Sequence, residues 1–572
     1  MKTWPKIDLL TCLAIVVVLV ALFARLGELP FRDPDEGRNA EVAHELHLSG
    51  SWLVPTYDGL TYLDKPVFFF KAVALSFSVF GESEFAARLP SALFATLLLG
   101  MLFAFCRREY PERQIAPLAV IITATSPLFF ALARHVIFDM TLAFFVSAAI
   151  FCGYLAESPT SKNRRAWYLL GSAAAGFATL VKGPVGFVVP LLVMVIFNLV
   201  ERRQGWGRRA FHPLNILVFL AVVLPWFVGL SLERPDFPYY GLVEESFHRF
   251  TTTSSFQRGG PIYYYGFVLL GGLFAWSILL PEASVRAWQN RSKLVSADRF
   301  FIVWAIAVVI FFSISKSKLP HYILTVPVAL GALLARLVVT ALKNPTGEAS
   351  RMIFRGLLFL AVLSIAFAGF LSLDFFRPGT YTHLGFRGSE FGRLTVLFAP
   401  SACVFLAVAL VAAVAFWRRD IRIAFATFLL LPILTLTVDF GALLLYSESS
   451  SSRPIAQGIP ALPPEIPVVS FECFPCGLPY YLKRSVTLVT KDGFETSSNY
   501  VMFTLKKTKD WPSVIISYNQ WDQWQASQKS AFFLLADRKS HDMLDSLASQ
   551  RKAEVREIAP GWWGAMIPPE SN

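Results

Sequence analysis

Mostly apolar stretches of about 18 to 25 residues recur along the chain from residue 9 to residue 446, and each can cross a bilayer as one α-helix. The composition agrees with this pattern, because 55% of the 572 residues are hydrophobic and only 16% are charged. A soluble domain carries about 25% charged residues. These features exclude a soluble enzyme, a coiled coil, collagen, a disulfide-rich secreted fold and a disordered chain.

Thirteen of these runs are predicted to be transmembrane helices. They lie at residues 9–26, 88–105, 115–133, 138–155, 166–181, 183–200, 213–231, 262–280, 299–315, 320–340, 354–373, 392–416 and 422–446. One further apolar segment, residues 66–80, is shorter than a crossing requires and is interrupted by Lys71. We expect this segment to form an interfacial or re-entrant helix.

The basic residues in the short loops give the orientation. With thirteen crossings and the N-terminus inside, the loops after the second span carry 19 Lys and Arg on the inner side and 10 on the outer side. Lys and Arg accumulate in cytoplasmic loops, so this arrangement is favoured, and it places the C-terminus outside. Counting residues 66–80 as a span would put the excess of Lys and Arg on the outer side. The formal net charge of +12 is therefore explained by basic loop residues that set the topology and meet lipid phosphates. Nucleic acid is not an expected partner.

The predicted organisation is an all-α membrane domain at residues 1–446, with a large outer loop at 27–87, followed by a soluble α/β domain at 447–572. Short β-type runs in that domain lie at 466–472, 486–490, 500–505, 513–517 and 531–536, before a helix at 538–549. Nothing in this domain resembles a catalytic constellation, so docking of a ligand or stability is its expected role. Its Cys473 and Cys476 form a C-x-x-C pair, for which a local disulfide, a zinc site and a redox role remain open.

Polar residues gather in the outer loops, while the middle of the predicted spans holds almost no charge. A carboxylate such as Asp139, at the mouth of a span, is costly unless it is paired or functional. Lys182 precedes Gly-Pro, which is typical of a turn, but a lysine there can also reach a lipid phosphate. An ion-coupled transporter would need ionisable groups near the midplane, so the pattern favours chemistry at the outer surface.

Several short motifs in these loops occur together in one order. They are Asp-Glu-Gly-Arg at 35–38, Tyr-x-x-Lys-Pro at 62–66, Ala-Arg-Leu-Pro at 87–90, Arg-x-x-x-x-Asp-Met at 134–140, Lys-Gly-Pro at 182–184, Pro-Trp at 225–226 and Lys-Leu-Pro-His-Tyr at 318–322. In this order the chain resembles the bacterial polyprenyl-phosphate-dependent sugar transferases related to the 4-amino-4-deoxy-L-arabinose transferase of lipid A. It resembles protein O-mannosyltransferases more distantly.

The resemblance implies a GT-C membrane fold of about 13 helices, with periplasmic surface helices and a periplasmic C-terminal domain, in the bacterial inner membrane. It also implies an inverting transfer of a sugar, 4-amino-4-deoxy-L-arabinose, from undecaprenyl phosphate to a phosphate of lipid A. One alternative is transfer to protein hydroxyl groups. A second alternative, from a different class, is a transporter of lipid-linked sugars.

The resemblance further implies roles for individual residues. Asp35 and Asp139 would be the catalytic carboxylates. Lys65, Lys182 and Arg38 would bind the donor phosphate, and the substrate pocket would include Glu36, Tyr62, Arg134 and Tyr322. This chain has Glu245-Ser246 where many relatives have Glu-His, so a divalent metal would instead need Asp64 and His248.

Overall fold

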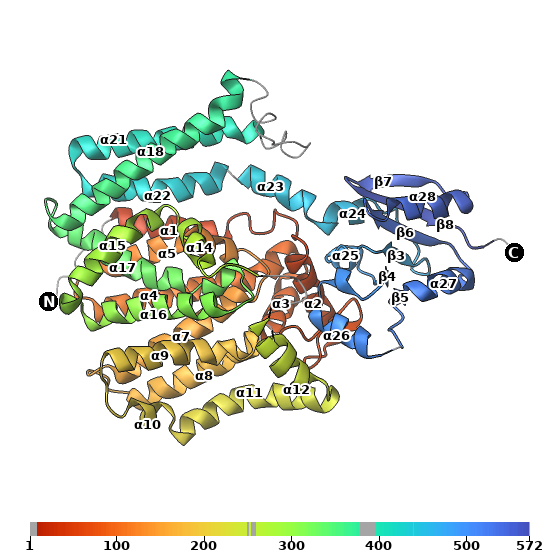
Figure 1. Ribbon diagram of the computed structural model, residues 1–572, viewed down its shortest axis with the longest axis horizontal. Coiled ribbons are helices and arrows are strands. Elements are labelled where there is room, and N and C mark those ends of the chain that lie inside the picture. The colour runs from red at the N-terminus through yellow and green to blue at the C-terminus, as the bar shows by residue number, and fades with distance from the viewer. Residues whose placement is uncertain are drawn as a thin grey trace.

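The computed structural model describes residues 9–248, 251–252, 259–377, 395–438, 440–508 and 510–570. Helices stacked side by side form the larger part of the molecule, and a domain with a β-sheet lies at one end of the stack (Figure 1). The helices α2 (Asp35–Ser49) and α3 (Phe68–Phe80), from the first large loop, lie between the two parts (Figure 1).

Helices occupy all thirteen predicted runs. They are α1 (Leu9–Phe23), α4 (Glu84–Glu109), α5 (Ile115–Ala124) with α6 (Pro127–Ala133), α7 (Asp139–Glu157), α8 (Arg164–Lys182), α9 (Val185–Val200), α11 (Pro213–Glu233), α14 (Tyr264–Gly272) with η2 (Trp276–Leu279) and α15 (Leu280–Gln289), α16 (Ser296–Ile314), α17 (Val326–Lys343), α18 (Glu348–Phe376), α21 (Phe398–Arg418), and α22 (Ile421–Val438) with α23 (Phe440–Ser449).

Two of the predicted runs are bent rather than straight. The run at 115–133 turns by 71° between α5 and α6, and the run at 262–280 turns by 117° after α14. Within the described residues, seven helices are long and apolar enough to cross a membrane alone, or up to nine if each bent pair is one span. The remaining predicted runs, which hold α1, α8, α9 and α22, do not meet that criterion by themselves.

The core of the helical part is built from aromatic and small side chains. Phe105, Phe300 and Trp304 are buried in one aromatic cluster shared by α4, α7 and α16. Small residues let backbones approach each other closely, as is common between membrane helices. A Cβ added at Gly186 of α9 would lie only 2.3 Å from the backbone of Ala178 in α8. These two helices therefore pack together at the end that carries Lys182.

The first large loop folds as a compact layer. The segment predicted to be interfacial, residues 66–80, contains α3, whose 13 residues are too few for a crossing. One side of α3 is buried through Phe69, Phe70 and Val73, whereas Leu75 and Val79 are exposed. An amphipathic helix of this kind suits a membrane surface. A short hairpin of β1 (Thr56–Tyr57) and β2 (Leu60–Thr61) completes the loop.

The C-terminal domain is an α/β fold around a six-stranded sheet. The strand order is β5-β4-β3-β6-β8-β7, in which β3, β4, β5 and β6 are parallel and β8 and β7 are antiparallel. The strands are β3 (Val468–Phe471), β4 (Val486–Thr490), β5 (Ile515–Ser517), β6 (Phe532–Asp537), β7 (Val555–Ala559) and β8 (Trp562–Ile567). The helices are α24 (Ser452–Gly458), α25 (Leu478–Leu482), α26 (Asn499–Lys507), α27 (Trp521–Ser527) and α28 (His541–Gln550).

Four of the five predicted β-type runs contain strands, and the helix predicted at 538–549 is α28. The run at 500–505 is wrongly predicted as a strand, because it lies within α26. The hydroxyl of Ser498 caps that helix by accepting a hydrogen bond from the Val501 N–H group, and Val501 and Leu505 then bury one face at helical spacing. The final hairpin of β7 and β8 has no counterpart in the sequence-based prediction.

Cys473 and Cys476 are both buried free thiols, so the disulfide considered for this C-x-x-C pair is absent. The Cys473 Sγ atom lies 3.8 Å from the carbonyl oxygen of Leu535, and the Cys476 Sγ atom lies 3.9 Å from that of Thr496. Burial raises the pKa of each thiol to about 12. Because the thiolate is the reactive form, the structure does not favour a redox role for this pair.

The first loop and the C-terminal domain share a buried polar interface. Asp58, in the turn between β1 and β2, accepts a hydrogen bond from the Val486 N–H group at 2.9 Å. The carboxylate is 2% exposed, and burial raises the pKa of Asp58 to about 8. The folded protein therefore binds a proton that the unfolded chain releases near pH 4, so this stabilising contribution is lost as the pH rises toward and through 8.

Replacing Asp58 with asparagine is expected to raise the thermal unfolding temperature by a few degrees at pH 8 and by less at pH 5. The amide keeps an acceptor for the Val486 N–H group and needs no proton. Thermal unfolding of the purified protein between pH 5 and pH 8 measures this. Asp522→Asn changes an exposed carboxylate of the C-terminal domain and serves as the control. An equal gain at both pH values would contradict the expectation.

Candidate active site

A cavity of about 640 Å³ lies at the end of the helical part that faces the C-terminal domain. Most of its wall is apolar and comes from α7, α8, α9, α11 and the segment that follows α11. Charged residues line one end of it. The principal lining residues are Asp64, Lys65, Asp139, Lys182, Val188, Phe219, Phe227, Phe237, Leu242, Glu245, Phe312 and Tyr322. An apolar cavity with a few convergent polar groups is the usual form of a ligand site.

The first charged pair in the cavity joins two helix ends. Asp139 opens α7 and Lys182 closes α8, and the Lys182 Nζ atom lies 2.5 Å from Asp139 Oδ1. The ammonium group also lies over the rings of Phe138 and Tyr322, 4.9 and 4.7 Å from their centroids. Asp139 is almost fully buried, and its other oxygen lies 3.6 Å from His321 Nε2. Asp139 is therefore placed as the counter-ion of Lys182.

The second charged pair joins the first loop to the segment after α11. Lys65 forms an ion pair with Glu245 and donates a hydrogen bond to the carbonyl oxygen of Asp64 at 2.6 Å. Glu245 lies in a π-helical segment, η1 (Tyr240–His248). The Lys65 and Glu245 side chains are only 8% and 14% exposed. Two lysines, each held by a carboxylate, thus face one apolar cavity.

Asp35, Arg38 and Tyr62 form a neighbouring cluster that does not belong to the cavity wall. Arg38 Nη2 donates to Asp35 Oδ1 at 2.6 Å, and the guanidinium lies 5.9 Å from the centroid of the Tyr62 ring. Asp35 is about half exposed, whereas Arg38 and Tyr62 are buried. Burial raises the pKa of Tyr62, and the negative charges of Asp64 and Glu245 raise it further. The charge of Arg38 acts in the opposite direction.

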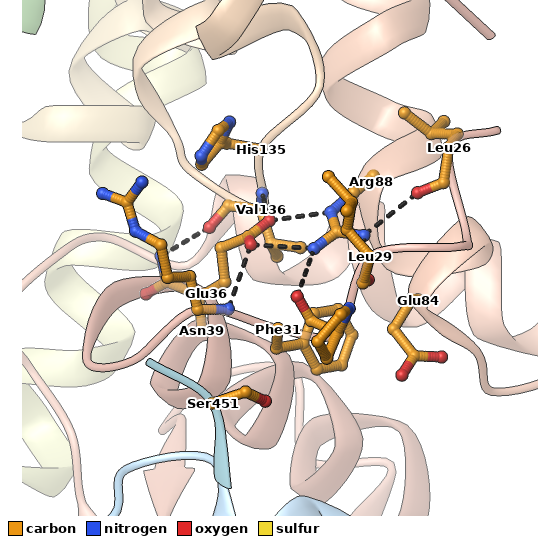
Figure 2. A network of polar contacts seen from close by, with 12 residues as sticks. Leu26, Leu29, Phe31, Glu36, Asn39, Glu84, Arg88, His135, Val136 and Ser451 are labelled. Atoms are coloured by element: carbon orange, nitrogen blue, oxygen red, sulfur yellow. Dashed lines mark hydrogen bonds and ion pairs between the residues drawn. The ribbon is translucent and has the colours of Figure 1, made fainter. Parts of the chain in front are cut away.

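Glu36 does not line the cavity and instead holds Arg88 of α4 (Figure 2). Its two oxygens accept hydrogen bonds from Arg88 Nε and Nη2, both at 2.8 Å, and Oε1 also accepts one from the Val136 N–H group at 2.9 Å. Burial is the largest single influence and raises the pKa of Glu36. The charges of Arg88 and His135, together with the hydrogen bonds from Arg88 and Val136, outweigh it, and the pKa is lowered to about 2. The structure thus gives Glu36 a part in fixing α2 to α4.

Arg134 also lies outside the wall of the cavity. Its Nη1 atom donates to the carbonyl oxygens of Ala21 and Leu22 at 2.5 and 3.1 Å. These carbonyls lie in the last turn of α1, where backbone acceptors have no partner within the helix. Arg134 is therefore positioned to cap α1.

The predicted metal pair, Asp64 and His248, has separate partners. Asp64 accepts hydrogen bonds from the Tyr240 hydroxyl and from the N–H groups of Asn499 and Tyr500, at 2.7 to 3.0 Å. The His248 Nδ1 atom contacts Glu244 at 3.2 Å. Over the described ranges, no group of three or more His, Cys, Asp or Glu residues is placed to hold a metal ion. The arrangement of this pair does not fit a metal site, and a metal requirement stays a prediction.

Glu245, which lines the cavity, and Asn499, which contacts Glu245, are absent from the predicted site. Glu245 stands where many relatives have the Glu of a Glu-His pair, and this match is the sequence signal that could have identified it. Asn499 belongs to the C-terminal domain, and no local signal marks it. Its side-chain amide donates to Glu245 Oε2 at 3.1 Å. The polar end of the site is thus built from both parts of the chain.

Comparison with known proteins gives the family. A family model described as "Dolichyl-phosphate-mannose-protein mannosyltransferase" matches residues 64–228. The undecaprenyl phosphate-alpha-4-amino-4-deoxy-L-arabinose arabinosyl transferase of Edwardsiella ictaluri is 31% identical over 411 residues, which are 71% of this chain and 73% of that protein. The chain belongs to this arabinosyl transferase family. The alignments to the relatives from Proteus mirabilis and Photorhabdus laumondii cover 61% and 64% of those proteins.

The fold of the family extends over the whole chain. The crystal structure of ArnT from Cupriavidus metallidurans bound to undecaprenyl phosphate aligns with 99% of this chain and 100% of its own, with a TM-score of 0.81 and 26% identity. The structure of the same protein in the apo state aligns with a TM-score of 0.78. Together with its apolar helices, this similarity shows that the chain is a multi-pass membrane protein of GT-C type with a C-terminal β-sheet domain.

Proposed function

We propose that the chain transfers 4-amino-4-deoxy-L-arabinose from undecaprenyl phosphate to a phosphate group of lipid A. The reaction would take place at the periplasmic face of the bacterial inner membrane, in agreement with the basic residues of the opposite loops. Family membership supports the sugar and the lipid carrier, because these are the groups in the names of the relatives. The acceptor, the periplasmic orientation and the inner membrane are parts of the proposal.

The observation that carries the proposal is the pair of buried lysines at the polar end of an apolar cavity. Lys65 and Lys182 can take a phosphate group, while the apolar wall accepts the first isoprenoid units of a lipid tail. Charge-assisted hydrogen bonds to phosphate are strong where water is excluded. An amphiphilic phosphate ester therefore matches both halves of the cavity.

The same lysines suit the chemistry of transfer. An oxygen of the acceptor phosphate attacks the anomeric C1 atom from the face opposite the donor phosphate, so the C1–O bond to that phosphate breaks with inversion. The electron pair of the broken bond stays on the leaving undecaprenyl phosphate, whose new charge Lys65 and Lys182 would stabilise. A phosphate acceptor is already ionised, so Asp35 would orient the amino sugar or the acceptor. For a hydroxyl acceptor, Asp35 would take the proton.

Asp35→Asn is expected to lower sugar transfer by about 10²-fold or more while the protein still inserts in the membrane. Cells that lack the chain are complemented with wild-type protein or the variant, and lipid A is analysed by mass spectrometry for the added amino sugar. Asp492→Asn changes an exposed carboxylate of the C-terminal domain and is the control. Full modification by Asp35→Asn would refute the role of Asp35. Unchanged lipid A with altered glycoproteins would favour a protein acceptor.

A further inference from the structure

The start of α26 with its N-cap, residues 498–500 of the C-terminal domain, reaches the polar end of the cavity. The N–H groups of Asn499 and Tyr500 donate to the carboxylate of Asp64 at 3.0 and 2.7 Å. The side-chain amide of Asn499 donates to Glu245 Oε2. Asp64 precedes Lys65, and Glu245 is the ion-pair partner of that lysine. The C-terminal domain therefore contacts both neighbours of one phosphate-binding cation.

Glu245 is shared between two partners of different kinds. Its Oε1 atom pairs with the Lys65 ammonium, and its Oε2 atom accepts the hydrogen bond from the Asn499 amide. An anion that binds to Lys65 competes with Glu245 for the ammonium group. A carboxylate left beside that anion without a strong donor would repel it, because like charges in a buried site raise each other's energy. The Asn499 amide can keep its hydrogen bond to Glu245 while the anion replaces Glu245 as the partner of Lys65.

We propose that Asn499 is a positioning residue for donor binding, which acts by holding Glu245 as the exchangeable counter-ion of Lys65. This inference rests on the proposed function, because it takes the incoming anion to be the phosphate of the lipid-linked donor. Without the amide, Glu245 keeps Lys65 as its main partner and competes more strongly with the phosphate. The soluble domain thus sets the affinity of a site whose lysines belong to the membrane part.

The anchoring of α26 does not depend on this amide. The Tyr500 hydroxyl donates to Asp236 at 2.9 Å, and the Tyr500 ring packs edge-on against Tyr240 at 4.9 Å between centroids. Ser498 caps the helix through its own hydroxyl. Truncating the Asn499 side chain therefore removes its contact with Glu245 and leaves the other contacts of the helix in place.

The test measures binding of undecaprenyl phosphate to the purified full-length protein in lipid nanodiscs. Asn499→Ala is expected to weaken binding about tenfold, as the loss of one hydrogen bond to a charged group allows. In the transfer assay the donor KM should rise by a similar factor while kcat changes by less than about twofold, because Asn499 does not touch the reacting atoms. Ser498→Ala perturbs the same helix cap but keeps the amide, so its affinity should match the wild type.

A double-mutant cycle separates positioning from a structural role. In a Glu245→Ala background, Asn499→Ala is expected to cause no further loss of affinity, because its effect passes through Glu245. Wild-type affinity of Asn499→Ala, or the same tenfold loss in both backgrounds, would overturn this inference and leave the proposed function intact. A wild-type protein that does not bind undecaprenyl phosphate would overturn both.

Discussion

Replacing Lys182 with methionine should reduce sugar transfer by about 10²- to 10³-fold, the usual effect of removing one group that stabilises charge in a transition state. The Lys182 ammonium lies between Asp139, Phe138 and Tyr322, at the polar end of the cavity. Methionine keeps the length and the apolar stem of the side chain but cannot neutralise a leaving phosphate. The initial rate of transfer by the purified protein, at saturating donor, measures the effect.

A second variant guards against a loss of folding. Lys182→Met leaves Asp139 buried without its cation, which is itself destabilising. The double variant Lys182→Met/Asp139→Asn removes both charges, so it should regain thermal stability and remain inactive. Lys71→Met changes a lysine of α3 that does not line the cavity and should keep wild-type activity. Recovery of transfer in the double variant would contradict a phosphate-binding role for Lys182.

Replacing Glu36 with glutamine should lower the free energy of unfolding by about 3–5 kcal/mol, because it leaves a buried guanidinium without its counter-charge. Arg88 is 3% exposed, and it also donates to the carbonyl oxygens of Leu26 and Leu29 at 3.0 and 2.6 Å (Figure 2). It donates to the carbonyl oxygen of Pro30 at 3.0 Å as well. Glutamine can accept only part of the forked contact that Glu36 makes. Denaturation of the purified protein in detergent, followed by tryptophan fluorescence, measures the loss.

A matched pair at the surface provides the control. Glu28 forms an ion pair with Arg25 at 2.6 Å, but both side chains are about half exposed. Exposed ion pairs contribute little to stability, so Glu28→Gln should leave the unfolding transition unchanged. If Glu28→Gln and Glu36→Gln had equal effects, Glu36 and Arg88 would not be the structural pair that their burial indicates.

Much of the membrane architecture could be predicted because its signals are local. A run of apolar residues must satisfy its backbone as a helix in lipid, so helices fall on all thirteen runs. Lys71 and the short length of its segment predicted that α3 does not span the membrane, and the 13 residues of α3 agree with this. The bends after α5 and α14 could not be predicted, because apolar length alone does not show where packing turns a helix.

The candidate site, too, could be predicted only in part. Motif order brought Lys65, Asp139, Lys182 and Tyr322 into one predicted site, and all four line the cavity. Glu36 stands in the same motif as Asp35, but its partner Arg88 lies 52 residues further along the chain. A motif shows which residues occur together, and only the tertiary structure shows which charge each carboxylate neutralises.

By itself, the sequence determined that the chain lies in a membrane, and it predicted which way its loops point and which motifs gather on the outer side. Those properties follow from hydrophobic length, loop charge and residue order, all of which are read along the chain. Only the tertiary structure decided that Lys65 pairs with Glu245, 180 residues away, and that Asn499 of the soluble domain holds the same carboxylate. Such contacts depend on packing between distant segments, and no local pattern encodes them.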